Sequence, residues 1–319
     1  MLARTVGIAG ASLLLNLGAV AVTPAAPCGD EIRRASEKIA FFEARAEKSP
    51  GSWIDMERAA AAYTERARLS GRLTDLAFAE DLLERAFAAA PDGAGPHLTQ
   101  ARLDFTLHRF DRVEARLAAA ERRIVLDDPT RAAILGMRGD LAFQEHRLDD
   151  AVRLFEEALD LHESPEGLSR LAKARDHAGR TAEADSLFAA AAALEHGPAG
   201  WSRAWIALQR GQLRLNAGDA GGALEHFRAA ENLCPGWWQT DRLLAAALAE
   251  QGETDAAITR ITRAAETSER PATLRAAADL LAGAGRPDEA REWNVRAHRV
   301  EHDLADRFPE IVQDACGRG

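Results

Sequence analysis

Apolar residues recur three and four positions apart along most of the chain, which is the spacing that places them on one face of an α-helix. The clearest stretch covers residues 204–238. There the pattern predicts one helix to about Asn216, a turn at Gly218–Asp219, and a second helix that Pro235–Gly236 ends. This stretch is therefore expected to be two helices folded against each other.

A fixed set of small and aromatic residues marks this helix pair and returns elsewhere. Gly211, Ala223, Phe227 and Ala230 are twelve, four and three positions apart, and residues 139–158 repeat that spacing. The small residue of the second helix recurs every 33 or 34 positions, apart from one step of 39 that contains an insertion at residues 196–200. Such self-similarity predicts a stack of like units rather than two ordinary domains.

The rest of the chain fits around these units. Ser52 and Asp55 form a capping pattern before a helix that runs to about Leu69, and the helix after it is expected at residues 74–90. The predicted layout is a leader at residues 1–25, a lead-in helix at 26–51, about seven helix pairs at 52–303, and a helix end with a tail at 304–319.

The period, with two helices per unit, resembles that of the tetratricopeptide repeat (TPR) family. The resemblance implies an all-α fold in which helix-turn-helix repeats stack into a right-handed superhelical solenoid. It assigns repeat-packing roles to small residues, aromatic plugs and terminators, which here are Gly139, Ala151, Phe155, Ala184, Phe188, Gly211, Ala223, Phe227, Ala230, Pro235, Ala257 and Ala290. Ile261 and Asn294 stand where the family has a plug, and Asn294 makes the last unit look like a capping repeat.

In that family the first helix of each pair lines a concave surface where partners bind. The resemblance therefore implies a groove of mixed apolar and charged residues, suited to an extended peptide or a partner helix. The residues at these positions are Leu98, Arg102, Phe105, Asp140, Phe143, Gln144, Lys173, Asp176, His177, Trp205, Gln212, Asn216, Arg242, Glu250, Arg275 and Asp279. Trp205 fits a binding role or a packing role equally, whereas packing is favoured for Trp237, Trp238 and Trp293.

Composition narrows the class of partner. The chain has 40 Lys and Arg against 50 Asp and Glu, a formal charge of −10, and the arginines are interleaved with acids rather than clustered. Affinity for nucleic acid rests on an excess of basic residues, so a nucleic-acid partner is not expected. No cofactor and no small-molecule substrate are expected, and the predicted partner is a protein or peptide.

Residues 1–25 resemble a secretory signal peptide, with a single charge before an apolar run and small-x-small cleavage sites. An uncleaved anchor or a lipoprotein is the alternative, and membrane contact is expected only in those cases. Export permits disulfides. Of Cys28, Cys234 and Cys316, only a Cys234–Cys316 bridge is expected to be within reach, because Cys28 and Cys316 belong to opposite ends of a long solenoid.

One catalytic pattern occurs in the chain. Residues 298–302 match the H-x-x-E-H pattern of inverted zinc peptidases, with His298 and His302 four residues apart on a helix and Glu301 between them. Five-residue patterns also arise by chance. The prediction is therefore a non-enzymatic scaffold or assembly factor of a bacterial envelope, exported to the periplasm or secreted, with no metal site. A zinc-dependent hydrolase and a self-associating structural subunit are the alternatives.

Overall fold

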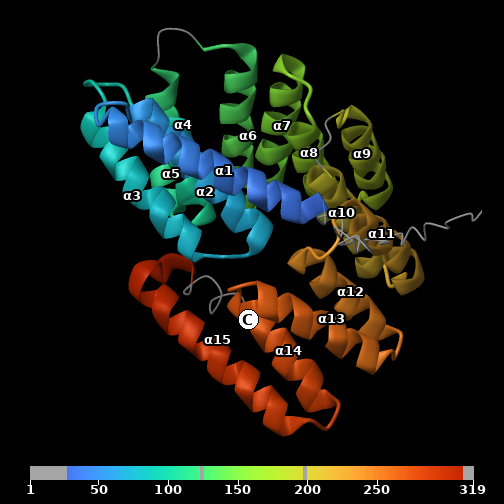
Figure 1. The fold of residues 1–319 in the computed structure, drawn as a ribbon. Helices are drawn as coiled ribbons and strands as arrows, with labels where there is room; N and C mark the ends of the chain where they lie inside the picture. The colour runs from blue at the N-terminus through green and yellow to red at the C-terminus, as the bar shows by residue number, and fades with distance from the viewer. Residues whose placement is uncertain (1–26, 123–125, 197–199, 312–319) are drawn as a thin grey trace, which may run out of the picture.

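The computed structural model describes residues 27–122, 126–196 and 200–311. Within these ranges the chain forms fifteen α-helices and no strand (Figure 1). Their bounds are α1 Pro27–Lys48, α2 Trp53–Ser70, α3 Thr74–Ala89, α4 His97–Thr106, α5 Phe110–Glu121, α6 Asp128–Gln144, α7 Leu148–Leu161, α8 Pro165–His177, α9 Thr181–Leu194, α10 Gly200–Asn216, α11 Ala220–Leu233, α12 Trp238–Glu250, α13 Thr254–Thr267, α14 Pro271–Gly283 and α15 Pro287–Arg307. The leader predicted at residues 1–25 lies outside the described residues.

The helices pack in sequence order as an all-α solenoid of tetratricopeptide type, as predicted. Helices α2 to α15 pair as seven consecutive hairpins, and α1 packs on α2 ahead of them. Helix α1, Pro27–Lys48, lies within the lead-in helix predicted at residues 26–51, and it packs lengthwise on α2 (Figure 1).

The crossing of each hairpin depends on a small residue facing an aromatic plug. A Cβ atom added to Gly139 would collide with the ring of Phe155, and one added to Gly211 would collide with the ring of Phe227. Phe155 and Phe227 are at most 2% exposed. Because interiors are close-packed, the absence of a side chain on the glycine is what lets the ring fill the crossing.

A left-handed residue makes the turn inside the repeats. It stands two positions before the second helix and is glycine in four of them, with φ values of 74–79° at Gly179, Gly218, Gly252 and Gly285. In the α4–α5 and α6–α7 hairpins this position is His108 and His146, with φ of 61° and 59°. These two turns therefore use a conformation that a side chain disfavours.

The two ends of the solenoid meet. Phe308 and Leu304, at the end of α15, belong to the same buried cluster as Leu73 and Leu107 from the N-terminal hairpins. The α2–α3 turn touches the α13–α14 turn, where the Glu269 amide donates to the Gly71 carbonyl at 3.2 Å. In Figure 1, α15 correspondingly lies below α2 and α3.

Ion pairs also connect the N-terminal hairpins to the end of α15. Arg109, whose side chain is 9% exposed, bonds to Glu80 of α3 and, at 3.0 Å, to Glu310 beyond α15. Arg307 pairs with Asp81 at 2.7 Å. The superhelix is therefore closed between its first and last repeats.

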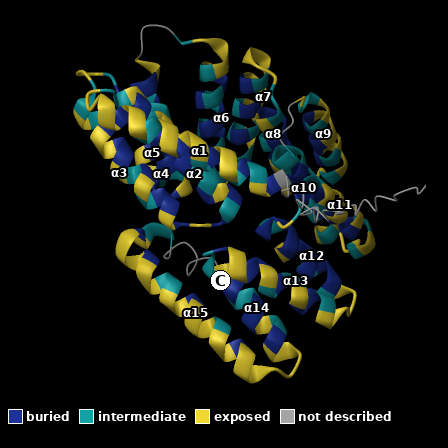
Figure 2. Ribbon diagram, in the orientation of Figure 1, coloured by how far each residue is buried: buried dark blue, intermediate teal, exposed yellow. Residues whose placement is uncertain are grey.

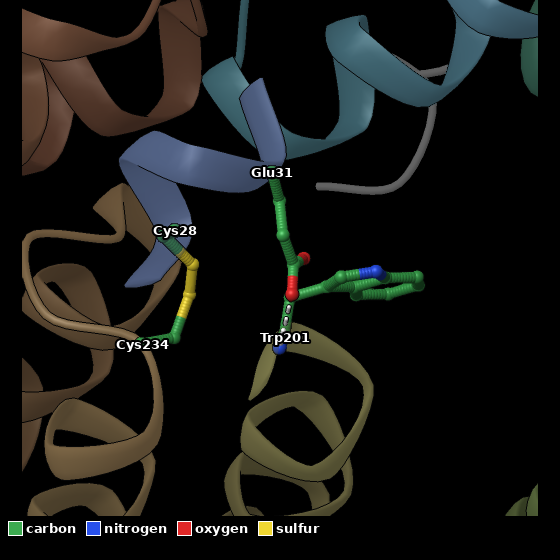
Figure 3. The surroundings of a disulfide bond; sticks show 4 residues. All are labelled: Cys28, Glu31, Trp201 and Cys234. Atoms are coloured by element: carbon green, nitrogen blue, oxygen red, sulfur yellow. Dashed lines mark hydrogen bonds between the residues drawn. A yellow bond between two sulfur atoms is a disulfide. The ribbon is translucent and has the colours of Figure 1, made fainter. Parts of the chain in front are cut away.

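A disulfide makes a second connection across the chain. Cys28 in the first turn of α1 is bonded to Cys234, at the end of α11, with their Cα atoms 4.9 Å apart (Figure 3). Three residues further along α1, a Glu31 carboxylate oxygen accepts from the Trp201 amide at 3.3 Å. The view that Cys234 could reach only Cys316 is therefore wrong, because closure brings the N-terminal helix, which a straight solenoid would hold far away, to the α11–α12 turn. Cys316 lies outside the described residues.

Burial follows the repeat pattern (Figure 2). Buried residues concentrate where helices face each other, whereas the outer side of α15 is largely exposed. Asn294 at the plug position of this last helix is exposed, and Ile261 in the preceding hairpin is 1% exposed. Across the residues described, none of the helices is both long and apolar enough to span a bilayer.

Candidate functional site

Two adjoining hollows open on the inner side of the closed superhelix. The first, about 720 Å³, lies between α2 on one side and α4, α6 and α8 on the other. The second, about 420 Å³, continues it past α8 toward the start of α10. The residues that line both are Arg68, Phe105, Asp140, Phe155, Glu166 and Arg170. Together they form one elongated cavity, called the inner cavity below.

Seven of the predicted groove residues line the inner cavity. They are Arg102, Phe105, Asp140, Phe143, Gln144, Lys173 and Trp205. They come from four successive first helices, α4, α6, α8 and α10. The family-derived rule that first helices line the concave side therefore matches the position of these residues.

The other nine predicted residues do not line it. Leu98 packs against the buried cluster of α4–α6, the ring of His177 meets Phe143 edge-on, and Asp176 accepts from the Thr181 hydroxyl at 3.0 Å. Gln212 donates to Asn216 at 2.9 Å, so these two side chains satisfy each other.

The remaining four belong to the C-terminal hairpins, beyond the inner cavity. Arg275 is held by Glu301 at 2.6 Å. Arg242, Glu250 and Asp279 are exposed. The inner cavity therefore uses only the N-terminal and central part of the predicted groove.

The opposite wall of the inner cavity was missed by sequence reasoning. Arg68 of α2 stands 4.1 Å above the ring of Trp201, and Arg270 at the start of α14 lies 5.7 Å from the ring of Trp238. Arg68 and Arg270 both line the first hollow. Helix α2 is the first helix of its hairpin and packs on α4, so the same register that gave the other groove residues also places Arg68 on the concave side. Arg270 reaches the cavity because the α2–α3 turn meets the α13–α14 turn, and repeat periodicity gives no signal of that contact.

Trp205 both packs on a neighbouring ring and lines the inner cavity. Its ring meets the Phe188 plug edge-on at 6.4 Å, and it also lines the second hollow with Lys173 positioned 4.8 Å above it. Trp237 and Trp238 are buried at 2% and 8% exposure, which confirms their packing role. Trp293 is half-buried and packs beside the α13–α15 clusters.

The surrounding protein shifts the pKa values of several charged residues in the inner cavity. Arg170 donates from Nε to both oxygens of Asp140, at 2.9 and 3.1 Å. Burial nevertheless raises the pKa of Asp140 against the opposing effect of Arg170. Burial likewise lowers the pKa of Lys173, Arg68 and Arg102, although their side chains reach solvent inside the cavity. The cavity walls therefore disfavour the charged forms of these groups relative to bulk water, without removing them from solvent.

The three residues of the H-x-x-E-H pattern do not converge as the ligands of a zinc ion would. The side chains of His298 and His302 are 75% and 80% exposed, and Glu301 is engaged by Arg275. Across the described part of the chain, no three His, Cys, Asp or Glu side chains are grouped so as to hold a metal ion. The arrangement offers two solvated histidines and an acid used in helix packing.

No family model matches the sequence, and a search of curated proteins finds no match. Among solved structures, the crystal structure of the APC/C hetero-tetramer Cut9–Hcn1 is similar over 86% of this chain and 52% of that chain, with a TM-score of 0.60 and 14% identity. This chain thus spans about half the length of that one.

Two shorter solved structures align with part of this chain over nearly their whole length. They are TTC0263, a thermophilic TPR protein of Thermus thermophilus (22% identity, 56% of this chain and 97% of that chain, TM-score 0.43), and MamA (19%, 53% and 96%, TM-score 0.42). At such identities the likeness concerns architecture. The seven consecutive hairpins and the match to Cut9–Hcn1 together show that this chain has the fold of the tetratricopeptide repeat proteins.

Proposed function

We propose that this protein is a non-enzymatic scaffold that binds a segment of another protein in its inner cavity. The observation that carries the proposal is the inner cavity itself, which is elongated, contains aromatic and charged side chains together, and is lined by the five successive first helices α2, α4, α6, α8 and α10. Large aromatic side chains beside charged ones are typical of surfaces that hold peptide segments.

Phe143 and Trp205 are the aromatic anchors of this proposal. Both are half-buried, and both line the second hollow. Their rings are fixed by contacts with His177 and Phe188 respectively, so little side-chain entropy is lost on binding. The alternatives receive less support. The two histidines of the zinc motif are exposed and its glutamate is paired with Arg275. Closure occupies the two ends through which a solenoid subunit would stack.

The test is site-specific photocrosslinking in a native envelope extract. A crosslinking side chain at Phe143 is compared with one at Arg153, which is exposed on the outer helix α7. We expect position 143 to capture a defined segment of one or a few proteins, and Phe143→Ala with Trp205→Ala to abolish capture in protein that circular dichroism shows to be still folded at the assay temperature, although the loss of two packed rings lowers its melting temperature. Equal capture from both positions would show that the inner cavity is not the binding site.

We further propose that the protein acts in the envelope or outside the cell. The signal-like leader supports this location, and so does the Cys28–Cys234 bond, because disulfides persist mainly in oxidising compartments. The bond also engages the Cys28 sulfur that a lipoprotein would modify. Cell fractionation, with N-terminal sequencing and thiol alkylation of the native protein, tests the proposal. A cytosolic protein with an intact leader and free thiols would contradict it.

A further inference from the structure

The cationic side chains of the inner cavity differ from those of the outer surface. Outside, arginines stand beside acids: Arg138 pairs with Glu114 and Glu121, and Arg153 with Glu157, all within 2.8 Å. Inside, Arg68 and Arg102 have no carboxylate within ion-pair distance among the described residues. Lys173 and Arg270 are in the same situation.

Aromatic rings position three of these four cations. Arg68 stands over Trp201, Lys173 over Trp205, and Arg270 over Trp238. A ring face attracts a cation but leaves its N–H groups free to donate to a ligand. Arg270 lines the first hollow, and its Nε is buried without a hydrogen-bond partner.

The acids of the inner cavity do not offset these cations. Asp140 is engaged by Arg170, and Glu65 is bonded to Lys38 at 2.9 Å. The Glu195 carboxylate accepts from the Ser202 hydroxyl, which brings no positive charge. Among the residues that line the inner cavity, two acids, Glu166 and Glu195, therefore remain without a cationic partner, compared with four cations without an acidic partner. The cavity thus has an excess of positive charge, although the net charge of the protein is −10.

From this arrangement we propose that the segment bound in the inner cavity is acidic, with its Asp or Glu carboxylates received by Arg102, Lys173 and Arg68. The inference rests on the proposed function and specifies the chemistry of the partner. A carboxylate placed here would pair with cations that have no carboxylate partner of their own among the described residues, and charge-assisted hydrogen bonds are stronger than neutral ones. The acidic exterior would repel the same segment, which directs it to the cavity.

A substitution at Glu166 tests whether the bound segment carries negative charge. It lines both hollows, and its charge acts on Arg68 and Arg102 without a hydrogen bond to either. If an acidic segment binds between these arginines, Glu166 repels it, and Glu166→Gln should bind more tightly. A merely structural role for the arginines would give no such gain.

The probes are a fluorescent oligo-glutamate peptide and an oligo-glutamine peptide of the same length, with binding followed by anisotropy and by quenching of tryptophan emission. We expect oligo-glutamate to bind with an affinity that falls as salt rises, and oligo-glutamine to bind about tenfold more weakly or not at all. Arg102→Gln with Lys173→Gln should weaken oligo-glutamate about tenfold or more. Arg147→Gln with Arg153→Gln, which removes the same charge from the outer surface, should change it less than about twofold.

Several outcomes would overturn the inference. Equal binding of the two peptides, no binding of oligo-glutamate, or weaker binding by Glu166→Gln would each show that the cavity does not select acidic segments. Full competition by free glutarate or phosphate at the affinity of the peptide would assign the cations to a small anion instead. Crosslinking from Phe143 to a neutral segment would leave the scaffold proposal standing while the acidic one fails.

Discussion

The central hairpins, α6 to α11, and the contacts that close the superhelix are built in different ways. The central hairpins use the same solution repeatedly, with a small residue of one helix facing a buried phenylalanine of the next. The closure contacts, in contrast, do not repeat along the chain. They are the Cys28–Cys234 bond, Phe308 in the buried cluster of α2 and α3, and Arg109 between two glutamates.

This difference separates what makes the fold from what shapes the inner cavity. Repeated packing fixes the hairpins, because each contacts only its neighbours and buries its apolar face locally. Closure then sets where α2 lies relative to α8 and α10, and thereby the position of Arg68 opposite Arg102 and Lys173. Variants that weaken closure should therefore disturb the inner cavity, whereas variants in the central hairpins should disturb the fold itself.

The largest expected effect is the loss of the disulfide. Cys28→Ser with Cys234→Ser removes a crosslink across a sequence separation of 206 residues, and chain-entropy reasoning gives a loss of up to about 5 kcal/mol in the free energy of unfolding. Denaturant unfolding measures the loss, and reduction of the wild-type protein should reproduce it. Cys316→Ser is the matched control and should leave stability unchanged. A loss in that variant would favour the bridge that the structure contradicts.

Phe308→Ala and Phe227→Ala compare closure with a central hairpin at equal burial. Each ring is at most 1% exposed, and each truncation should cost about 3–5 kcal/mol. Hydrogen exchange should separate them. Phe308→Ala is expected to speed exchange in α3 and the end of α15, and Phe227→Ala in α10 and α11, because local openings follow local packing.

Val295→Ala is the control for this pair. Val295 is 54% exposed on α15, so its truncation should change stability by less than about 0.5 kcal/mol. If Phe308→Ala also left exchange in α3 unchanged, α15 and the N-terminal hairpins would not be packed together in solution.

The sequence was sufficient for the hairpins and for one wall of the inner cavity. Phe155 and Phe227 could be assigned as plugs because their spacing from Gly139 and Gly211 repeats, and repetition is visible in one sequence. Phe105, Lys173 and their equivalents followed from the same register. That register also extended the groove to Arg275 and Asp279, which lie outside the cavity.

The contacts across the superhelix that complete the cavity could not be predicted, for a physical reason. Small changes in the angle between successive hairpins accumulate along a solenoid, and they decide whether its ends meet. No single residue encodes that sum. The contacts of Arg68 with Trp201 and of Cys28 with Cys234 join residues far apart in the sequence, and neither has a spacing pattern that would identify its partner.

Gly211→Ala tests the central packing rule with a smaller effect. A Cβ atom there would meet the ring of Phe227, so we expect a net loss of about 1–3 kcal/mol despite the better helix propensity of alanine. Gly283→Ala, where no atom lies within 4 Å of the added Cβ, should be neutral or stabilising. Equal effects at the two positions would remove steric packing as the reason for glycine at the crossing.

The smallest expected effect is a gain in stability, at the turn of α6–α7. His146 is exposed and adopts φ of 59° where the α8–α9 turn has Gly179 at 75°. Left-handed backbone costs a side-chain-bearing residue about 1–2 kcal/mol, so His146→Gly should stabilise by up to about 1 kcal/mol after the entropy cost of glycine. The reciprocal Gly179→His, with open space around its Cβ, should lose about as much through the backbone alone. Both changes should appear as shifts in the denaturant midpoint at constant m-value. A loss in His146→Gly would mean that the imidazole contributes a contact worth more than the strain, and the turns of the central hairpins would then no longer be interchangeable.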